Sequence, residues 1–212
     1  MTPIIFGLLL LAAWKTVWIS AVSILMGLTF GVVVAAARAS DHVALRWSAR
    51  AYVSFFRGVP LLVQLLLIYN LLPSIGIDVP STVAAIAGLS LCTAAYQAEN
   101  LRGGFDAVPK SLLEAADMVG LTPLQRMFRI HAPLAFRLTL PSLVNEAIMI
   151  LKSSSLVSVV GVIELTRMAQ DLDTSFKPLQ LYTAAGALYF IINRSVAYLG
   201  SYAEARLAWG RA

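Results

Sequence analysis

One apolar stretch of the chain carries side chains that could take part in chemistry. Lys152 precedes three serines at 153–155, and Glu146 lies earlier in the same stretch. A serine and a lysine can act together as nucleophile and general base. However, the sequence shows no oxyanion-stabilising or orienting group beside this pair. The pattern therefore indicates a protein without catalytic residues, not an enzyme.

The same polar groups are costly wherever they face lipid. A charged side chain near the bilayer centre costs about 2.5 to 3.5 kcal/mol on insertion scales, so such residues usually face a protein interior or a water-filled cavity. Two interpretations stay open: hydrogen bonds that hold helices together, or the lining of a path through the membrane. The residues that we assign to the path are Asn145, Glu146, Lys152, Ser153, Ser154, Glu164 and Gln64.

A second polar interruption, residues 111–133 ("SLLEAADMVGLTPLQRMFRIHAP"), has the pattern of a helical hairpin. Ser111 and Glu114 have the spacing of a capping box, in which a hydroxyl and a carboxylate satisfy free backbone donors, and they predict a helix start. Gly120 is the residue type that most readily takes the left-handed conformation just past a helix end. The first arm of the hairpin is therefore expected to end at this glycine.

The second arm shows the same signals. Thr122 and Gln125 form another predicted capping box, with Pro123 at the first helical position, and Pro133 is expected to end the helix. Each arm has about nine residues, or roughly 13 Å, which is too short to cross a bilayer. We therefore expect the hairpin at the membrane surface, with its apolar side against headgroups, the spanning helices or another protein.

The elements that must position these groups are membrane helices. The chain is 59% hydrophobic and only 13% charged, against roughly 25% charged in ordinary soluble domains. A spanning helix needs about 20 mostly apolar residues. Five stretches qualify: about 14–37, 50–72, 80–101, 138–160 and 179–203. Residues 3–12 are interpreted as an interfacial lead-in and not as a signal peptide, because no basic residue precedes them.

The basic residues predict how these spans are oriented. Most of the 16 Lys and Arg residues fall in segments that the five spans place on one side, together with the hairpin. By the positive-inside rule that side is cytoplasmic, with the N-terminus outside and the C-terminus inside. The pI of about 9.6 is then explained by membrane orientation, and we expect membrane lipid but no nucleic acid as a partner.

Several kinds of site are not predicted. Cys92 is the single cysteine and the histidines are His42 and His131, so the sequence offers neither an intrachain disulfide nor a cluster with metal-ligand spacing. The phosphate-loop pattern G-x-x-x-x-G-K-[ST] is absent, so we expect no cofactor on this chain.

The polar segments resemble one known family. Within the hairpin, "EAADMVGLTPLQRMFRIHAP" is similar to the EAA loop of the membrane-spanning subunits of bacterial ABC importers, with matches at Glu114, Ala115, Ala116, Gly120 and Ile130. Four further segments resemble the polar amino-acid permease subfamily: "FFRGVPLLVQLLLIY", "AYQAENLRGGFDAVPKS", "PSLVNEAIMILKSSSLVSVVGVIELT" and "AGALYFIINRS". The similarity covers roughly residues 14–207.

The resemblance implies a mechanism and a set of partners. The hairpin would dock on a separate ATP-hydrolysing subunit, two per complex, which would bind ATP and Mg. A second permease copy or a related permease and an extracytoplasmic solute-binding protein would complete the complex in the bacterial inner membrane. The segment similar to "LKSSSLVSVVGVIEL" would lie beside the substrate path. Ser153 stands where the family commonly has an acidic residue. The resemblance therefore does not favour the cation-selective substrate site that is usual in this family.

These observations predict an all-α integral membrane protein with five transmembrane helices, similar to type I ABC importers, in which residues 1–212 form one permease domain. We expect it to translocate a polar amino acid or a related small solute by alternating access, with Glu114, Ala115, Ala116 and Gly120 as the residues of ATPase coupling. The alternative is a secondary transporter or channel that is driven by an ion gradient and uses Glu146 and Lys152 as relay groups.

Overall fold

The protein is built from helices, and the computed structural model describes residues 3–173 and 177–207. These residues contain no strand, which confirms the all-α prediction. The elements in chain order are α1 (Pro3–Arg38), α2 (Val43–Gly58), α3 (Leu61–Ser74), α4 (Ser81–Asp106), α5 (Lys110–Met118), α6 (Pro123–Arg126), η1 (Met127–His131), α7 (Ala132–Ser153), η2 (Ser154–Val160), α8 (Leu165–Asp173) and α9 (Pro178–Leu207).

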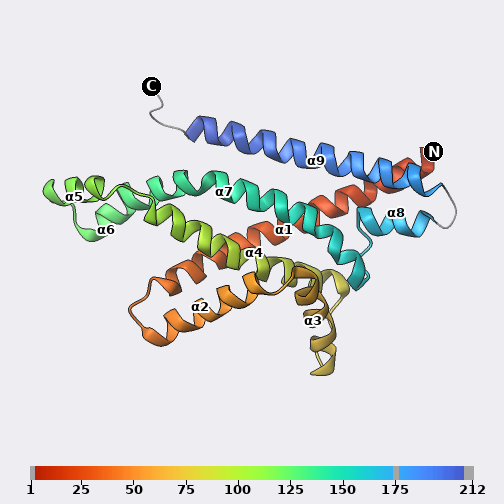
Figure 1. The fold of residues 1–212 in the computed structure, drawn as a ribbon, viewed down its shortest axis with the longest axis horizontal. Coiled ribbons are helices and arrows are strands. Elements are labelled where there is room, and N and C mark those ends of the chain that lie inside the picture. Colours follow the sequence, from red (N-terminus) through yellow and green to blue (C-terminus); the bar gives the residue numbers. More distant parts are fainter. Residues whose placement is uncertain (1–2, 174–176, 208–212) are drawn as a thin grey trace.

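The long helices lie side by side along one axis of the molecule. Helix α1 passes behind α4 and α7, and α2, α4, α7 and α9 follow one another across the front (Figure 1). Helices α5 and α6 lie at one end, together with the end of α1 and the start of α2; we call this the hairpin end. The first residues of α1 and helix α8 lie at the opposite end (Figure 1).

Small residues allow the closest of these helix contacts. Gly27 and Gly31 are one turn apart on α1 and face α4. A Cβ built on Gly27 would come within 2.5 Å of the Thr93 Cβ, and one on Gly31 within 2.8 Å of the Gln97 Cβ. Such small residues let two backbones approach in a membrane, where packing and not the hydrophobic effect drives helix association. The register of α1 on α4 therefore depends on these two glycines.

The largest apolar core joins segments that are far apart in the sequence. It brings together α1, α3, α4, the end of α7 and the 3-10 turns of η2, and its buried members are Ile19, Leu65, Ala85, Leu89, Ile150, Val157, Val160 and Val162. The three serines after Lys152 thus lie where α7 changes into η2 and packs on this core.

Two continuous helical segments of the described chain are long and apolar enough to cross a membrane: Pro3–Arg38 and Pro123–Val160. The expected lead-in at 3–12 is the first part of α1 and not a separate element. Helices α4 and α9 cover the expected spans 80–101 and 179–203. Their composition is less apolar, because α4 is rich in small polar residues and α9 carries Asn193 and Arg194. The crossing of these two helices stays a prediction.

The expected span 50–72 is not a single straight helix in the structure. The chain breaks between Gly58 and Leu61, and α2 and α3 meet at 111°. Pro60 has no N–H to continue the α2 hydrogen-bond ladder. The Gln64 Nε2 donates instead to the carbonyls of Phe56 and Val59, at 2.8 and 2.7 Å. The bent pair can still count as one broken span, which gives up to three candidates in all.

Candidate functional site

The turn of the hairpin has the geometry that its glycine predicts. Gly120 has φ +80°, which confirms the left-handed residue after α5. Its N–H donates to the Asp117 carbonyl at 3.0 Å, and the Leu121 N–H donates to the Ala116 carbonyl at 3.1 Å. These bonds satisfy two of the carbonyls that a helix end leaves free. The α5 end is therefore held by backbone bonds that a glycine permits at little strain.

The second arm begins as predicted. The Gln125 N–H donates to the Thr122 Oγ1 at 3.3 Å, and the Thr122 N–H donates to the Gln125 Oε1 at 3.0 Å. Pro123 occupies the first turn. This confirms the second capping box and fixes the direction in which the chain leaves the turn.

Two other hairpin predictions are wrong. Ser111 does not cap α5, because the helix already begins at Lys110, with the extended Pro109 in the cap position and no side-chain cap bond. Pro133 does not end the second arm either. The π-helical turn of η1 precedes it, and the Ala132 N–H bonds five residues back to the Met127 carbonyl. This wider turn shifts the hydrogen-bond ladder just where Pro133 has no donor, so the helix continues into α7.

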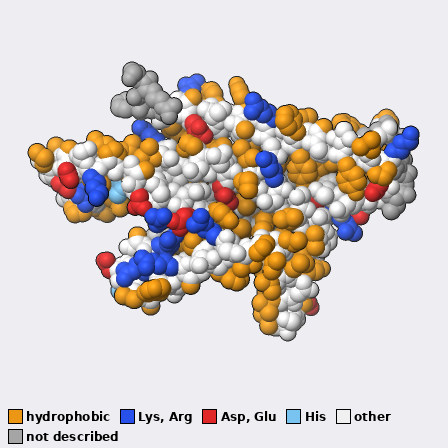
Figure 2. Space-filling model, in the orientation of Figure 1, with side chains coloured by type: hydrophobic (Ala, Val, Ile, Leu, Met, Phe, Trp, Pro, Cys, Tyr) orange, Lys and Arg blue, Asp and Glu red, His pale blue; other side chains and the backbone are white. Residues whose placement is uncertain are grey.

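The hairpin is tied to the body but leaves its tip exposed. Arg126 forms an ion pair with Asp117 across the two arms. The His131 Nε2 lies 3.2 Å from the Phe105 carbonyl at the end of α4. Figure 2 shows hydrophobic side chains in orange on the surface at the hairpin end. The most exposed apolar residues of the hairpin are Met118 (88% exposed), Val119 (81%), Leu124 (68%) and Phe128 (68%). We call these four residues the hairpin tip.

The four predicted coupling residues take different positions on this hairpin. Glu114, Ala115 and Gly120 are exposed, whereas Ala116 is buried. Ala116 therefore packs inside the protein and cannot itself line a surface for a partner. The most exposed apolar side chains of the hairpin belong to the hairpin tip, which the family motif did not single out.

Three of the seven residues predicted for the path have structural partners. Gln64 caps the end of α2, as described above. The Ser154 Oγ donates to the Leu151 carbonyl at 2.7 Å. Glu164 is fully buried, and its carboxylate accepts hydrogen bonds from the backbone N–H groups of Thr166 and Arg167 at 2.9 and 2.8 Å.

Glu164 also fixes the position of α9. The Tyr189 hydroxyl donates to the Glu164 Oε2 at 2.7 Å, while Glu164 caps the start of α8. Burial raises the pKa of this carboxyl, and the hydrogen bonds that it accepts partly oppose that shift. Glu164 thus links α8 to α9, and nothing in its surroundings presents it to a solute.

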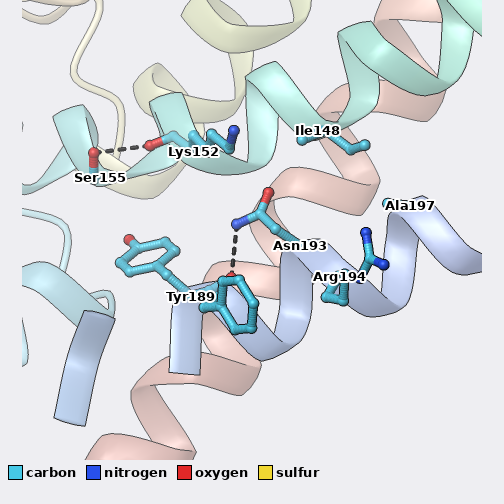
Figure 3. A pocket seen from close by; sticks show the side chains of 8 residues that line it. Ile148, Lys152, Ser155, Tyr189, Asn193, Arg194 and Ala197 are labelled. Atoms are coloured by element: carbon cyan, nitrogen blue, oxygen red, sulfur yellow. Dashed lines mark hydrogen bonds between the residues drawn. The ribbon is translucent and has the colours of Figure 1, made fainter. Parts of the chain in front are cut away.

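The remaining four path residues lie along one segment. Asn145 and Lys152 are exposed and Glu146 and Ser153 are half-buried, all on α7. Lys152 lines a pocket between α7 and α9 with a volume of about 440 Å³. We call it the α7–α9 pocket, and its lining residues are Ile148, Lys152, Ser155, Tyr189, Phe190, Asn193, Arg194 and Ala197. Figure 3 shows Lys152 approaching from α7 and Arg194 from α9.

The α9 side of this pocket was not predicted, although the sequence carries a signal for it. Asn193 and Arg194 interrupt the last apolar stretch as Glu146 and Lys152 interrupt the fourth. Charged and polar side chains are costly in a membrane helix unless they face a protein interior or a cavity. This argument, used above for Glu146 and Lys152, also applies to Asn193 and Arg194.

An ion-pair cluster near the hairpin end was also missed. Glu99 on α4 pairs with Arg38 from α1 and Arg102 from α4, and the Arg57 Nη1 from the end of α2 lies 3.5 Å from its Oε2. The Arg57 guanidinium also lies 5.4 Å from the centre of the Tyr96 ring. One carboxylate therefore joins the ends of three helices. No local pattern announces it, because its members are spread over the first half of the chain.

Comparisons with known proteins agree on one family. The model of the "binding-protein-dependent transport system inner membrane component" family matches residues 27–209. The probable amino-acid ABC transporter permease protein YckA of Bacillus subtilis is 37% identical over 194 residues, which cover 91% of this chain and 86% of YckA. The L-cystine transport system permease protein TcyB of the same organism is 34% identical over 207 residues, or 97% of this chain and 87% of TcyB.

A solved structure extends this likeness to the fold. The crystal structure of an amino acid ABC transporter with histidines contains a chain that is 33% identical to this one. The two superpose with a TM-score of 0.90, and the match covers 94% of each chain. The overall helical arrangement of this chain is therefore one that an experimental structure also shows.

Proposed function

Because the chain belongs to the family of binding-protein-dependent inner membrane components and is the permease subunit of an amino-acid ABC importer, we propose that its α5–α6 hairpin transmits ATP-driven motion to a substrate path beside α7. The chain is an integral protein of the inner membrane and a transport component, not an enzyme. ATP hydrolysis takes place in a separate subunit, and a substrate-binding protein delivers the solute.

The proposed topology has five crossings, with the bent α2–α3 pair as the second. Helices α1, α4 and α9 run toward the hairpin end and α7 runs away from it, so the start of α1 and the end of α9 lie toward opposite ends of the molecule (Figure 1). Figure 2 shows Lys and Arg side chains concentrated near the hairpin end. By the positive-inside rule this end is cytoplasmic, the N-terminus is outside and the C-terminus is inside.

The hairpin tip supports the coupling role most directly. Four large apolar side chains are exposed along the hairpin, from the end of α5 through α6 to η1. Large exposed apolar groups gathered at one place mark contact sites. Their proposed partner is a cleft on an ATP-binding subunit that holds ATP and Mg, with two such subunits per complex and two permeases, either a homodimer or this chain with a related permease.

The geometry of the hairpin suits the transfer of force. The segment Pro123–Val160 is one helical unit, so a displacement of the tip moves α7 and the residues of the proposed path together. We propose that closing of the ATPase subunits rocks this unit between inward-facing and outward-facing arrangements. The comparisons do not favour an ion-gradient-driven transporter with Glu146 and Lys152 as relay groups.

A Gly120→Val variant tests the coupling role. A β-branched residue in the left-handed region costs roughly 1 to 2 kcal/mol, which is enough to disorder the turn while the spans remain packed. In vesicles that contain the complete complex, we expect stimulation of ATP hydrolysis by the loaded binding protein to fall at least about tenfold (a change of about 1.4 kcal/mol). Gly120→Asn should keep most of the stimulation, because Asn tolerates φ > 0.

Gly103→Val is the matched control for the tested glycine. Gly103 is exposed on α4 near the hairpin end, has open space for a Cβ and has no positive φ. Its variant should couple normally. Unchanged coupling in Gly120→Val, or equal losses in both variants, would contradict the proposal.

A further inference from the structure

The α7–α9 pocket contains two cations whose charges no nearby acid offsets. Lys152 and Arg194 both line it, and its lining includes no Asp or Glu. Neither cation forms an ion pair within residues 3–173 and 177–207, where the salt bridges involve other residues. Arg57 and Glu99, by contrast, show that this protein pairs its charges elsewhere. The residues that line the pocket therefore carry a net positive charge.

Such an arrangement is expensive inside a membrane unless something offsets it. Each cation near the bilayer centre costs about 2.5 to 3.5 kcal/mol on insertion scales, and two of them that face one space also repel each other. Glu146 precedes Lys152 on α7 and does not line the pocket. Glu164 lies behind Tyr189, where its oxygens already accept three hydrogen bonds. Neither acid is placed to neutralise the pair.

A polar acceptor lies between the two cations. The Asn193 Nδ2 donates to the Tyr189 carbonyl at 2.8 Å, which turns the Asn193 Oδ1 away from its own helix. Figure 3 shows this oxygen on the side toward Lys152 and α7. The atom is buried and has no hydrogen-bond partner in the protein. A buried acceptor without a donor costs about 1 to 3 kcal/mol, so a ligand with an N–H group would be stabilised there.

We propose that the α7–α9 pocket binds an amino acid with net negative charge, with one carboxylate on Arg194, the second on Lys152 and the ammonium group on the Asn193 Oδ1. This inference rests on the proposed function and names the charge class of its solute. A guanidinium binds a carboxylate through two parallel hydrogen bonds. The volume of about 440 Å³ lies in the range of small-molecule sites, about 300 to 1,000 Å³.

The charge balance favours this class over neutral and cationic amino acids. A neutral amino acid has one carboxylate and leaves one cation without a partner. A cationic amino acid would add a third positive charge to the pocket. Only a solute with two carboxylates and one ammonium group pairs both cations and the amide oxygen at once.

The test is equilibrium binding to the purified complex of permease and ATPase subunits in phosphatidylcholine nanodiscs without nucleotide. The probes are labelled L-glutamate, L-aspartate, L-glutamine and L-arginine. We expect glutamate or aspartate to bind at least tenfold more tightly than glutamine, and arginine to bind most weakly. In Arg194→Gln and Lys152→Gln, the affinity for the acidic probe should fall at least tenfold, to the level of glutamine. Arg194→Lys should recover part of it.

Arg50→Gln is the matched control, because it removes one positive charge from an exposed site on α2 outside the pocket. Its affinity for the acidic probe should stay within twofold of the parent chain. Equal binding of glutamate and glutamine, no saturable binding of either acidic probe, or unchanged affinity in both pocket variants would overturn the inference. Retention of an anionic lipid in the pocket in place of the acidic probes would also overturn it.

The same preparation separates this inference from the proposed function. Stimulated ATP hydrolysis in the parent complex and its loss in Gly120→Val report on coupling alone. Normal coupling without preference for an acidic probe contradicts only the pocket assignment. Hydrolysis that is insensitive to the binding protein contradicts the proposed function.

Discussion

The hairpin and the α7–α9 pocket are assembled in opposite ways. In the hairpin, the bonds that define its shape join residues within ten positions of one another, such as Thr122 with Gln125 and Asp117 with Arg126. In the pocket, Lys152 and Arg194 come from two helices with α8 between them. The hairpin presents apolar groups on a polar framework, and the pocket presents charges among apolar helices. The exposed groups of the hairpin are thus apolar in a polar segment, and the groups that line the pocket are charged in an apolar one.

This contrast teaches where each element draws its stability. The hairpin tip makes few contacts with the body, so its residues are free to serve a partner. Glu99 and Glu164, by contrast, hold separate helices together. Changes at the tip should therefore alter function more than stability, and changes at these two acids should do the reverse.

The largest expected effect is on function, from Met118→Asp at the hairpin tip. A carboxylate in the centre of an apolar contact must be desolvated when the ATP-binding subunit docks. We expect at least a tenfold loss of binding-protein-stimulated ATP hydrolysis, with stability of the isolated permease changed by no more than about 0.5 kcal/mol, because the side chain is 88% exposed. Met118→Leu should keep coupling. A stability loss as large as the functional one would break the contrast.

A smaller effect, this time on stability, is expected from Glu99→Gln. The substitution removes the negative charge that faces three arginines on α1, α2 and α4. The Glu99 side chain is 19% exposed, so solvent reduces the penalty for a broken buried pair to about 1 to 3 kcal/mol. Thermal unfolding of the permease in detergent measures it.

Asp106→Asn is the control for this prediction. Asp106 also pairs with Arg102, at 2.6 Å, but it is 66% exposed. Exposed pairs of this kind contribute about 0 to 1 kcal/mol. If both variants unfold at the same temperature, the cluster around Glu99 does not hold the helix ends together.

The smallest effect is expected from Glu164→Gln. The amide has one acceptor oxygen in place of two, so one of the Thr166 and Arg167 N–H groups loses its partner. We expect a loss of about 1 to 2 kcal/mol in the same unfolding assay. A double-mutant cycle with Tyr189→Phe checks the cause, because residues that share a hydrogen bond should show non-additive losses. Additive losses would show that Glu164 does not hold α9 through Tyr189.

Local signals account for what could be predicted from the residues alone. The αL turn at Gly120 and the capping box of Thr122 with Gln125 depend on atoms only a few residues apart, so the pattern was sufficient. The cap at Ser111 failed because Pro109 already occupies the cap position. The prediction that Pro133 ends the helix is wrong because the π-helical turn before it shifts the hydrogen-bond ladder where Pro133 has no N–H donor.

Long-range packing decided the remainder. The pairing of Arg57 with Glu99, the capping role of Gln64 across the α2–α3 break and the opposition of Lys152 and Arg194 each join separate helices. A pattern of residue types predicts that a charge in an apolar helix needs a partner, but it does not say which helix provides it.

The sequence by itself determined that this protein is helical, belongs in a membrane and carries a capped hairpin, because hydrophobicity and backbone hydrogen bonding act over short distances along the chain. Only the tertiary structure decided which charges are paired and which face a pocket. That outcome depends on how close two helices approach, and the approach depends on side-chain volumes such as those at Gly27 and Gly31, summed over the whole contact.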